Sequence, residues 1–195
     1  MRAAQNGEPS DGRVIAASVE DASAFRVIFE RHVDAIHRYL SRRVGWSLAD
    51  DLVSETFVTA FRKRSGYRSG TPDAGPWLYG IATNLVRRHW QAEQRLLDLF
   101  ARLGPEEEVL DTSEASIERL MAARQRPQLL AALADLDERF RDALLLHTWA
   151  DLTYEEIAQT LDIPVGTVRS RLARARARLR ESLEVAEPQH AKETP

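Results

Sequence analysis

The sequence predicts an all-α protein, built from two small helical domains that are joined by a flexible acidic linker. Apolar residues recur at three- and four-residue steps within two blocks, residues 22–97 and 126–183, and this spacing is typical of amphipathic helices. No segment alternates apolar and polar residues with the two-residue period of a strand. Between the blocks, residues 98–125 include the run 104–118, which holds six acidic residues and no basic one. That run is too charged to bury much surface, so it indicates a linker.

Composition excludes several classes of protein. The 195 residues contain 27 Lys+Arg, 30 Asp+Glu and no cysteine, which excludes disulfides, thiolate metal sites and cysteine nucleophiles. No two of the five histidines stand four residues apart, so we expect no metal site, no cofactor and no catalytic residue. The terminal segments 1–21 and 184–195 are expected to be disordered tails. Neither a signal peptide nor a membrane helix is evident, which predicts a cytoplasmic protein without membrane insertion.

The first block predicts three helices. The second of them is expected to begin near Leu48, with Ser47 as its cap. The segment YRSGTPDAGP, residues 67–76, is dense in Gly and Pro and therefore predicts a loop before the third helix. The residues of the three expected apolar stripes are Phe25, Ile28, Phe29, Val33, Ile36 and Leu40; Val53, Phe57, Ala60 and Phe61; and Leu78, Ile81, Ala82 and Leu85.

The second block predicts helices over LLAALADL, FRDALLLHTW and TYEEIAQTL, followed by an arginine-rich helix. The third of these begins at a capping box, with Thr153 as the cap and Glu156 three residues later, and is expected to end at Leu161. After a two-residue turn comes PVGTVRSRLARARARLR, residues 164–180, which contains six arginines and no acidic residue. Two helices joined by so short a turn indicate a helix-turn-helix motif.

The arginine-rich helix has two interpretations. In a helix-turn-helix motif the second helix enters the major groove of DNA, where arginine bonds guanine or phosphate. Thr167, Ser170 and Arg174 lie opposite the apolar stripe, with Arg171 beside them. The alternative is a solvated face of a structural helix, which is the usual meaning of a charge run seen alone. The short turn and the lack of a compensating Glu four residues before each arginine favour DNA contact.

A second polar face lies on the third helix of the first block. An aromatic ring can stack on an unpaired base, an amide can read a base edge, and arginines can hold the backbone, so this face fits single-stranded nucleic acid. The alternative makes Trp77 a core residue and the arginines solubilising groups, and composition does not decide between the two. The residues of this face are Trp77, Asn84, Arg87, Arg88 and Gln91, next to the loop that begins at Tyr67.

The second helix of the first block carries an acidic face. Asp51 and Glu55 are four residues apart, with Asp50 alongside, and lie nearly opposite the apolar stripe. Like charges at this spacing mildly destabilise an isolated helix. The face is therefore weak evidence for a positively charged partner, and ordinary solvated acids remain the alternative.

Three strings in this order resemble the extracytoplasmic-function (ECF) group of bacterial RNA polymerase sigma factors, in the sigma-70 family. They are DDLVSETFVTAF (50–61), WLYGIATNLVRRHW (77–90) and LTYEEIAQTLDIPVGTVRSRLARAR (152–176). The resemblance implies that residues 22–97 form sigma region 2 and residues 126–183 form sigma region 4. It further implies a subunit that brings core polymerase to specific promoters and helps to melt the minus-ten element, without catalytic activity of its own.

The resemblance also implies partners and roles for particular residues. The acidic face would dock on the β′ clamp helices of core polymerase. The β subunit of the polymerase and an anti-sigma factor are further expected partners. The linker would follow the RNA exit path, and the loop from Tyr67 to Pro76 would capture a flipped minus-ten base. The residues so assigned are Asp50, Asp51 and Glu55 for polymerase; Tyr67, Trp77, Asn84, Arg87 and Arg88 for the minus-ten element; and Thr167, Arg169, Ser170, Arg171 and Arg174 for the minus-thirty-five element.

Departures from the family pattern and two rival functions remain. Gly80 and Arg88 stand where the family often has a basic residue and an Asp, which leaves the minus-ten preference open, and Ala173 does the same for the minus-thirty-five preference. A stand-alone helix-turn-helix regulator would bind its operator tightly without polymerase. A helical adaptor that binds only protein would be insensitive to loss of the arginines.

Overall fold

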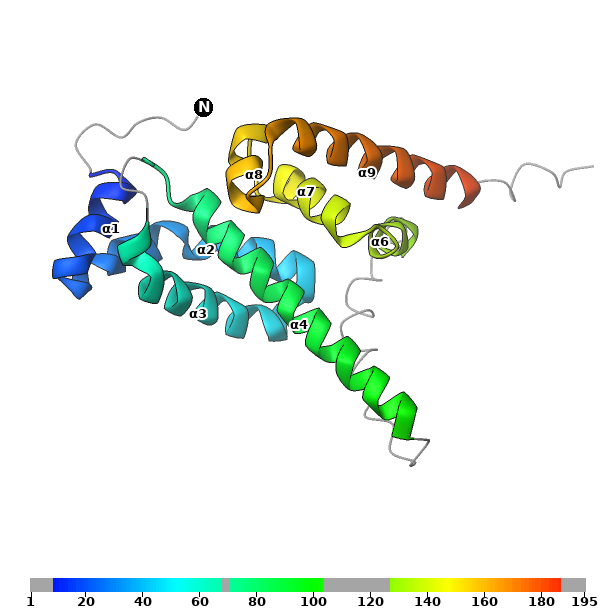
Figure 1. The fold of residues 1–195 in the computed structure, drawn as a ribbon, viewed down its shortest axis with the longest axis horizontal. Helices are drawn as coiled ribbons and strands as arrows, with labels where there is room; N and C mark the ends of the chain where they lie inside the picture. The colour runs from blue at the N-terminus through cyan, green and yellow to red at the C-terminus, as the bar shows by residue number, and fades with distance from the viewer. Residues whose placement is uncertain (1–8, 68–70, 104–126, 187–195) are drawn as a thin grey trace, which may run out of the picture. The chain divides into compact units, whose positions relative to one another are not determined.

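A computed structural model describes residues 9–67, 71–103 and 127–186, and within these residues every regular element is a helix (Figure 1). This confirms the predicted all-α class. None of the described helices is long and apolar enough to cross a membrane. The chain divides into two compact units, Met1–Arg95 and Leu96–Pro195.

The elements of the first unit are α1 (Asp11–Glu20), the short 3-10 helix η1 (Ala22–Phe25), α2 (Arg26–Val44), α3 (Trp46–Lys63), the 3-10 helix η2 (Arg64–Gly66) and α4 (Gly75–Leu103). Their shared core is apolar and contains Ile28, Ile36 and Leu40 from α2, Leu52, Val53 and Phe57 from α3, and Leu78, Ala82 and Leu85 from α4. Most of the predicted stripes are thus buried. Phe29 instead stays 42% exposed and packs one edge on Phe57, with 4.9 Å between ring centroids.

The turn between α2 and α3 differs from the prediction. Gly45 has φ 79° and ψ 170°, a combination that is open to glycine and strained for other residues. Its N–H donates to the Ser41 carbonyl (3.0 Å) to close α2, and its carbonyl accepts from the Ala49 N–H (3.2 Å) to open α3. The helix therefore begins at Trp46, and the expected start near Leu48 with a Ser47 cap is wrong.

The amino-terminal segment is a second correction. Residues 1–21 were expected to form a disordered tail, but residues 11–20 form helix α1. This helix buries Val14 and Ile15, which are 5% and 1% exposed, against the rest of the unit. Since most helical stability in proteins comes from tertiary packing, a short segment of modest propensity can fold here. Residues 1–8 lie outside the described part of the chain.

Helix α4 runs further than predicted. The linker was expected to begin at residue 98, but α4 continues to Leu103 because no helix breaker occurs before Gly104-Pro105. Residues 104–126, which hold most of the expected linker and its acidic run, lie outside the described residues. At the other end, α9 includes residues 184–186 of the expected carboxy-terminal tail, and residues 187–195 lie outside the description.

The second unit consists of α6 (Pro127–Ala134), α7 (Glu138–Trp149), α8 (Tyr154–Leu161) and α9 (Val165–Ala186). Helix α9 contacts the other three, so it is the central support of this unit. The capping box predicted for α8 is confirmed: the Thr153 hydroxyl accepts from the Glu156 N–H (3.2 Å), and the Glu156 carboxylate accepts from the Thr153 N–H (2.7 Å).

Candidate nucleic-acid and polymerase interfaces

A buried polar contact fixes how α4 is rotated on α2. The hydroxyls of Tyr39 and Thr83 lie 2.9 Å apart and are buried, and the Tyr39 ring meets the Tyr79 ring edge-on at 5.2 Å between centroids. Arg43 donates to the Tyr39 hydroxyl at 2.6 Å. A buried hydroxyl pair is costly to break, so this contact determines which side of α4 faces solvent.

The solvent-facing side of α4 carries amide and arginine side chains in line. Asn84, Arg88, Gln91 and Arg95 are exposed and recur at steps of three and four residues, as neighbours on one helix face do. Arg87 is half-buried on the flank of this face and makes a contact within the protein. Arg95 was missed by the sequence analysis, although its spacing from Gln91 could have indicated it.

Tyr67 and Trp77 form a ring pair at the start of α4. Their ring centroids lie 4.9 Å apart, and both residues are half-buried. The Tyr67 hydroxyl donates to the carbonyls of Thr71 (3.3 Å) and Asp73 (3.1 Å). Burial, with the nearby carboxylates of Asp11 and Asp73, raises the pKa of Tyr67 to about 12. Trp77 is therefore neither a fully buried core residue nor a freely exposed one.

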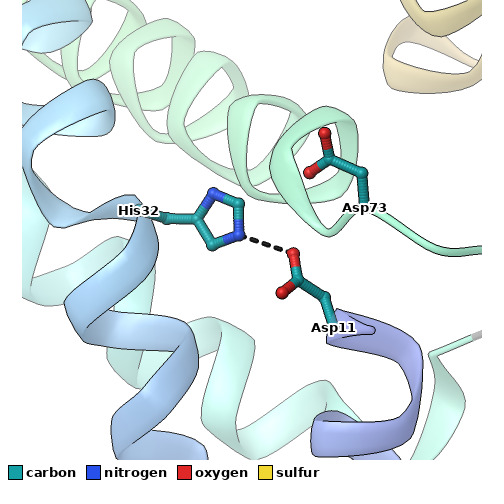
Figure 2. Close-up of side chains that lie close together, drawn as sticks. All are labelled: Asp11, His32 and Asp73. Atoms are coloured by element: carbon teal, nitrogen blue, oxygen red, sulfur yellow. Dashed lines mark hydrogen bonds and ion pairs between the residues drawn. The ribbon is translucent and has the colours of Figure 1, made fainter. Parts of the chain in front are cut away.

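Near this pair, polar groups from α1, α2 and the segment before α4 meet in a junction at Asp11 (Figure 2). Asp11 at the start of α1 accepts from His32 Nε2 of α2 (2.7 Å), from the Arg31 guanidinium (2.8 Å) and from the Ala74 N–H (2.9 Å). Burial alone would raise the pKa of Asp11, but these hydrogen bonds outweigh it and hold the pKa well below its usual range. Asp11 is therefore an ionised, nearly buried carboxylate.

The same junction contains a group that could offer ligands to a metal ion. Among the described residues, Asp11, His32 and Asp73 each present one such atom within 4.8 Å of the others. Both Asp11 oxygens, however, already accept hydrogen bonds, one of them from a guanidinium that would repel a cation. Asp73 uses one oxygen to accept from the Gly75 N–H at 2.7 Å. These contacts form a structural junction, and sequence spacing gave no indication of it because its members are far apart in the chain.

In the second unit, a tight turn sets α9 against α8. Asp162 has the left-handed conformation, with φ 52°, and the Ile163 N–H then donates to the Ala158 carbonyl (3.0 Å). The Pro164 carbonyl accepts from the N–H groups of the first turn of α9. The stripe formed by Val168, Leu172 and Ala175 is buried, and this confirms the predicted orientation of the helix.

The opposite face of α9 is polar and basic. Ser170 and Arg174 are exposed, and Thr167 and Arg171 are half-buried at its edges. Arg169 is also exposed, but at about 100° per residue it lies about 140° around the helix from Arg174. The structure therefore brings Thr167, Ser170 and Arg174 together and leaves Arg169 on the flank.

The acidic residues of α3 lie on its exposed side. Asp50, Asp51 and Glu55 are all exposed. The Asp50 carboxylate accepts a hydrogen bond from His37 Nε2 at 2.9 Å. Trp46, one turn earlier, is 68% exposed, and its ring lies 5.1 Å from the His37 ring between centroids. This exposed ring beside His37 and Asp50 was missed by the sequence analysis, although a tryptophan four residues before Asp50 was available as a signal.

A helical unit with an aromatic and basic face is thus followed by a helix-turn-helix unit, the motif of a large class of DNA-binding proteins. Comparison with known families makes this specific: the family description "Sigma-70 region 2" matches residues 28–96, and "Sigma-70, region 4" matches residues 126–179. The ECF RNA polymerase sigma factor SigE of Mycolicibacterium smegmatis is 34% identical over 96% of this chain and 71% of its own length. The ECF RNA polymerase sigma-E factor of Escherichia coli (strain K12) is 33% identical over 80% of this chain and 84% of its own length.

The chain belongs to the ECF group of the sigma-70 family, and it is an RNA polymerase sigma factor that directs transcription initiation. Solved structures agree with this fold. The sigma factor RpoE of Bartonella quintana, solved with the anti-sigma factor NepR, has a TM-score of 0.61 at 23% identity, covering 83% of this chain and 97% of that one. CnrH, solved with the cytosolic domain of CnrY, has a TM-score of 0.63 at 23% identity, covering 91% and 99%.

Proposed function

We propose that this sigma factor opens promoters by holding unpaired minus-ten bases between the exposed face of α4 and the loop before it. The observation that carries this proposal is the alignment of Asn84, Arg88 and Gln91 on one exposed face, beside the Tyr67–Trp77 ring pair. Extruding a base costs a few kcal/mol, and stacking with pocket contacts offsets that cost. Asn84 is assigned to the base edge, and Arg87 and Arg88 to the strand.

The basic face of α9 is assigned to the minus-thirty-five element as duplex. Thr167, Ser170 and Arg174 would meet the major groove at the start of the helix, where helix-turn-helix proteins contact base edges. Arg169 and Arg171, on the two flanks, are assigned to phosphates. This division follows from where each side chain lies around the helix.

The acidic face of α3 is assigned to core polymerase. Asp50, Asp51 and Glu55 are exposed on one helix and offer a negative surface for a basic partner surface, which we assign to the β′ clamp helices. Trp46, at 68% exposure, adds a large apolar group next to Asp50 at the start of the same helix. The β subunit would be contacted elsewhere, and no described residue is assigned to it.

Further parts of the proposal rest on the family. The two structural neighbours were solved with an anti-sigma factor, NepR, and with the cytosolic domain of CnrY, and we assign a partner of this kind to the present chain. The chain would have no catalytic activity of its own, because polymerase performs the chemistry. It would act in the cytoplasm, where bacterial polymerase and DNA are found.

The test is run-off transcription on sheared genomic DNA, with the purified protein and bacterial core polymerase that lacks other sigma factors. Discrete transcripts that require the protein are expected, and their start sites would define both promoter elements. Absence of transcripts, together with sequence-specific binding of DNA by the protein alone, would instead support a stand-alone helix-turn-helix regulator.

A further inference from the structure

Helix α1 is bonded directly to the segment that precedes α4. The Asp11 N–H donates to the Pro72 carbonyl (3.1 Å), and the Asp11 carboxylate accepts from the Ala74 N–H (2.9 Å). One residue of α1 thus holds two backbone groups of the segment 71–75 from outside it. Figure 2 shows Asp11 at the tip of α1, facing the base of α4.

Helix α2 fixes the carboxylate that makes this bond. Arg31 donates to one oxygen at 2.8 Å, and His32 Nε2 lies 2.7 Å from the other, with the Asp11 and His32 side chains each 9% exposed. Arg31 also donates to the Pro9 carbonyl at 2.9 Å. Charge-assisted hydrogen bonds of this length are strong, so the carboxylate has one defined orientation.

Tyr67 holds other backbone groups of the same segment. The phenol donates to the carbonyls of Thr71 and Asp73, and its ring packs on Trp77. Asp73 in turn caps the Gly75 N–H at 2.7 Å. The backbone from 71 to 75 is therefore hydrogen-bonded by both Tyr67 and Asp11.

The far end of α1 is anchored as well. Arg64 Nε donates to the Ser18 carbonyl at 3.0 Å, and its guanidinium also bonds the Phe61 carbonyl at 2.6 Å. Helix α1 is thus attached at one end to the end of α3 and at the other to the start of α4. It lies before residue 28, where the match to sigma region 2 begins.

We propose that Asp11 is a positioning residue for promoter opening: through Pro72 and Ala74 it holds the segment 71–75 in the conformation that accepts an unpaired minus-ten base. Asp11 does not touch DNA; it acts through the backbone, and His32 acts through Asp11. This inference rests on the proposed assignment of the Tyr67 loop to the minus-ten element. It adds that the assignment depends on a helix outside the matched region.

The test combines a structural and a functional measurement on the full chain. Amide hydrogen exchange at Ala74 and Gly75 is measured by NMR on the free protein. Holoenzyme binding is then measured on two probes from a promoter mapped by the transcription experiment: its minus-ten non-template single strand and its minus-thirty-five duplex. Asp11→Asn should speed exchange at Ala74 and weaken single-strand binding, each by about tenfold, and leave duplex binding unchanged.

Matched variants separate positioning from general stability. Val14→Ala removes a buried methyl pair from the same helix without touching the bonds to the segment 71–75, so it should lower stability but leave single-strand binding intact. His32→Gln keeps a donor for the Asp11 carboxylate and should behave like the wild type, whereas His32→Leu removes the donor and should resemble Asp11→Asn. This rescue would not be seen if residue 32 only filled space.

Two results would overturn the inference. Exchange at Ala74 in Asp11→Asn no faster than in a Val14→Ala protein of equal stability would show that Asp11 does not hold the segment. Faster exchange with unchanged single-strand binding would show that its conformation is irrelevant to opening. Failure of the proposed function itself would look different, because Asn84→Ala would then leave single-strand binding unchanged as well.

Discussion

Asp11 is both ionised and nearly buried, so its protonation should lower the stability of the first unit. Its pKa is held below the usual range by hydrogen bonds from His32, Ala74 and Arg31, which outweigh the opposing effect of burial. A carboxylate with a lowered folded pKa stabilises the protein fully above its unfolded pKa of about 4 and loses that contribution as the pH falls further. The acidic limb of stability should therefore report on this residue.

Asp11→Asn tests that expectation. At pH 7 the variant should unfold with a free energy about 2 kcal/mol lower than the wild type, because charged hydrogen bonds are lost. Below about pH 4 the wild type should lose stability faster than the variant, so the difference narrows. Urea unfolding followed by circular dichroism at several pH values measures this. A difference that stays constant down to the lowest pH would contradict the assigned ionisation.

Asn84 is the residue of α4 for which the proposed role is most specific. It neighbours Thr83, which is bonded to Tyr39, so its position on the exposed face is well fixed. Asn84→Ala should impair formation of the open complex more than initial binding of duplex promoter. Permanganate footprints of the melted region, compared with gel-shift binding of duplex, measure the two steps. Footprints identical to those of the wild type would remove Asn84 from the base pocket.

Arg174 is exposed on the polar face of α9, next to Ser170 around the helix. If it reads a base, Arg174→Ala should cost about 1–3 kcal/mol in binding to the minus-thirty-five duplex, and the preference at one base pair should relax. Arg180→Ala, exposed on a different side of the same helix, is the matched control. A loss of equal size on all sequences would make Arg174 a phosphate contact.

At the scale of elements, helix boundaries depend on backbone conformation. Gly45 is both the C-cap of α2 and the N-cap of α3, and its backbone conformation favours glycine. This arrangement sets the angle at which α3 presents its acidic face. A side chain at this position should therefore lower the stability of the first unit.

Gly45→Ala should lower the free energy of unfolding by about 1–3 kcal/mol, because alanine strains at φ 79°. Gly66→Ala is the control, since a Cβ there would meet nothing within 4 Å and the backbone is not left-handed. Thermal unfolding of both variants measures the contrast. Equal stability of the two would mean that the turn can adopt another conformation at little cost.

The elements that the sequence predicted best are those with local signals. Thr153 and Glu156 stand three residues apart, and the turn at Asp162 follows at once, so the helix-turn-helix could be predicted from one short stretch. Helix α1 could not, because Asp11 finds its partners 20 to 63 residues away and propensity alone does not form so short a helix. The predicted start of α3 was wrong because serine is a commoner N-cap than glycine. The cap is Gly45 because the turn requires a positive φ, which glycine adopts readily.

For the candidate sites, helical periodicity predicted which side chains are exposed, but it did not predict which side chains contact one another. The faces of α4 and α9 follow from helix geometry, so Asn84, Arg88 and Arg174 were expected to be exposed and are. The contact between the tilted rings of Trp77 and Tyr67 depends on a loop whose path no periodicity describes. That contact and the hydrogen bonds of Asp11 could be found only from the three-dimensional structure.

At the scale of the whole molecule, a net charge of −3 conceals faces of opposite sign. The acidic side chains of α3 and the basic ones of α4 and α9 are segregated on separate helices, so each can attract a different partner. Reversal of one sign should therefore affect one partner and spare the other.

The double reversal Asp51→Lys, Glu55→Lys should weaken binding of core polymerase by tenfold or more, about 1.4 kcal/mol. A competition assay against a labelled sigma factor measures it. Glu20→Lys with Asp34→Lys changes the net charge equally at exposed positions on α1 and α2, and should have little effect. Equal losses in the two proteins would reduce the docking surface to a general charge effect.

The bond between Asp11 and Ala74 has a consequence for how the chain matures. During synthesis Asp11 leaves the ribosome 63 residues before Ala74, its partner in the segment that precedes α4. Until Ala74 follows, the Asp11 carboxylate has Arg31 and His32 alone, and the apolar side chains Val14 and Ile15 of α1 have an incomplete surface to cover. The hydrogen bonds from α1 to the segment before α4 can therefore form only after most of the first unit has been synthesised.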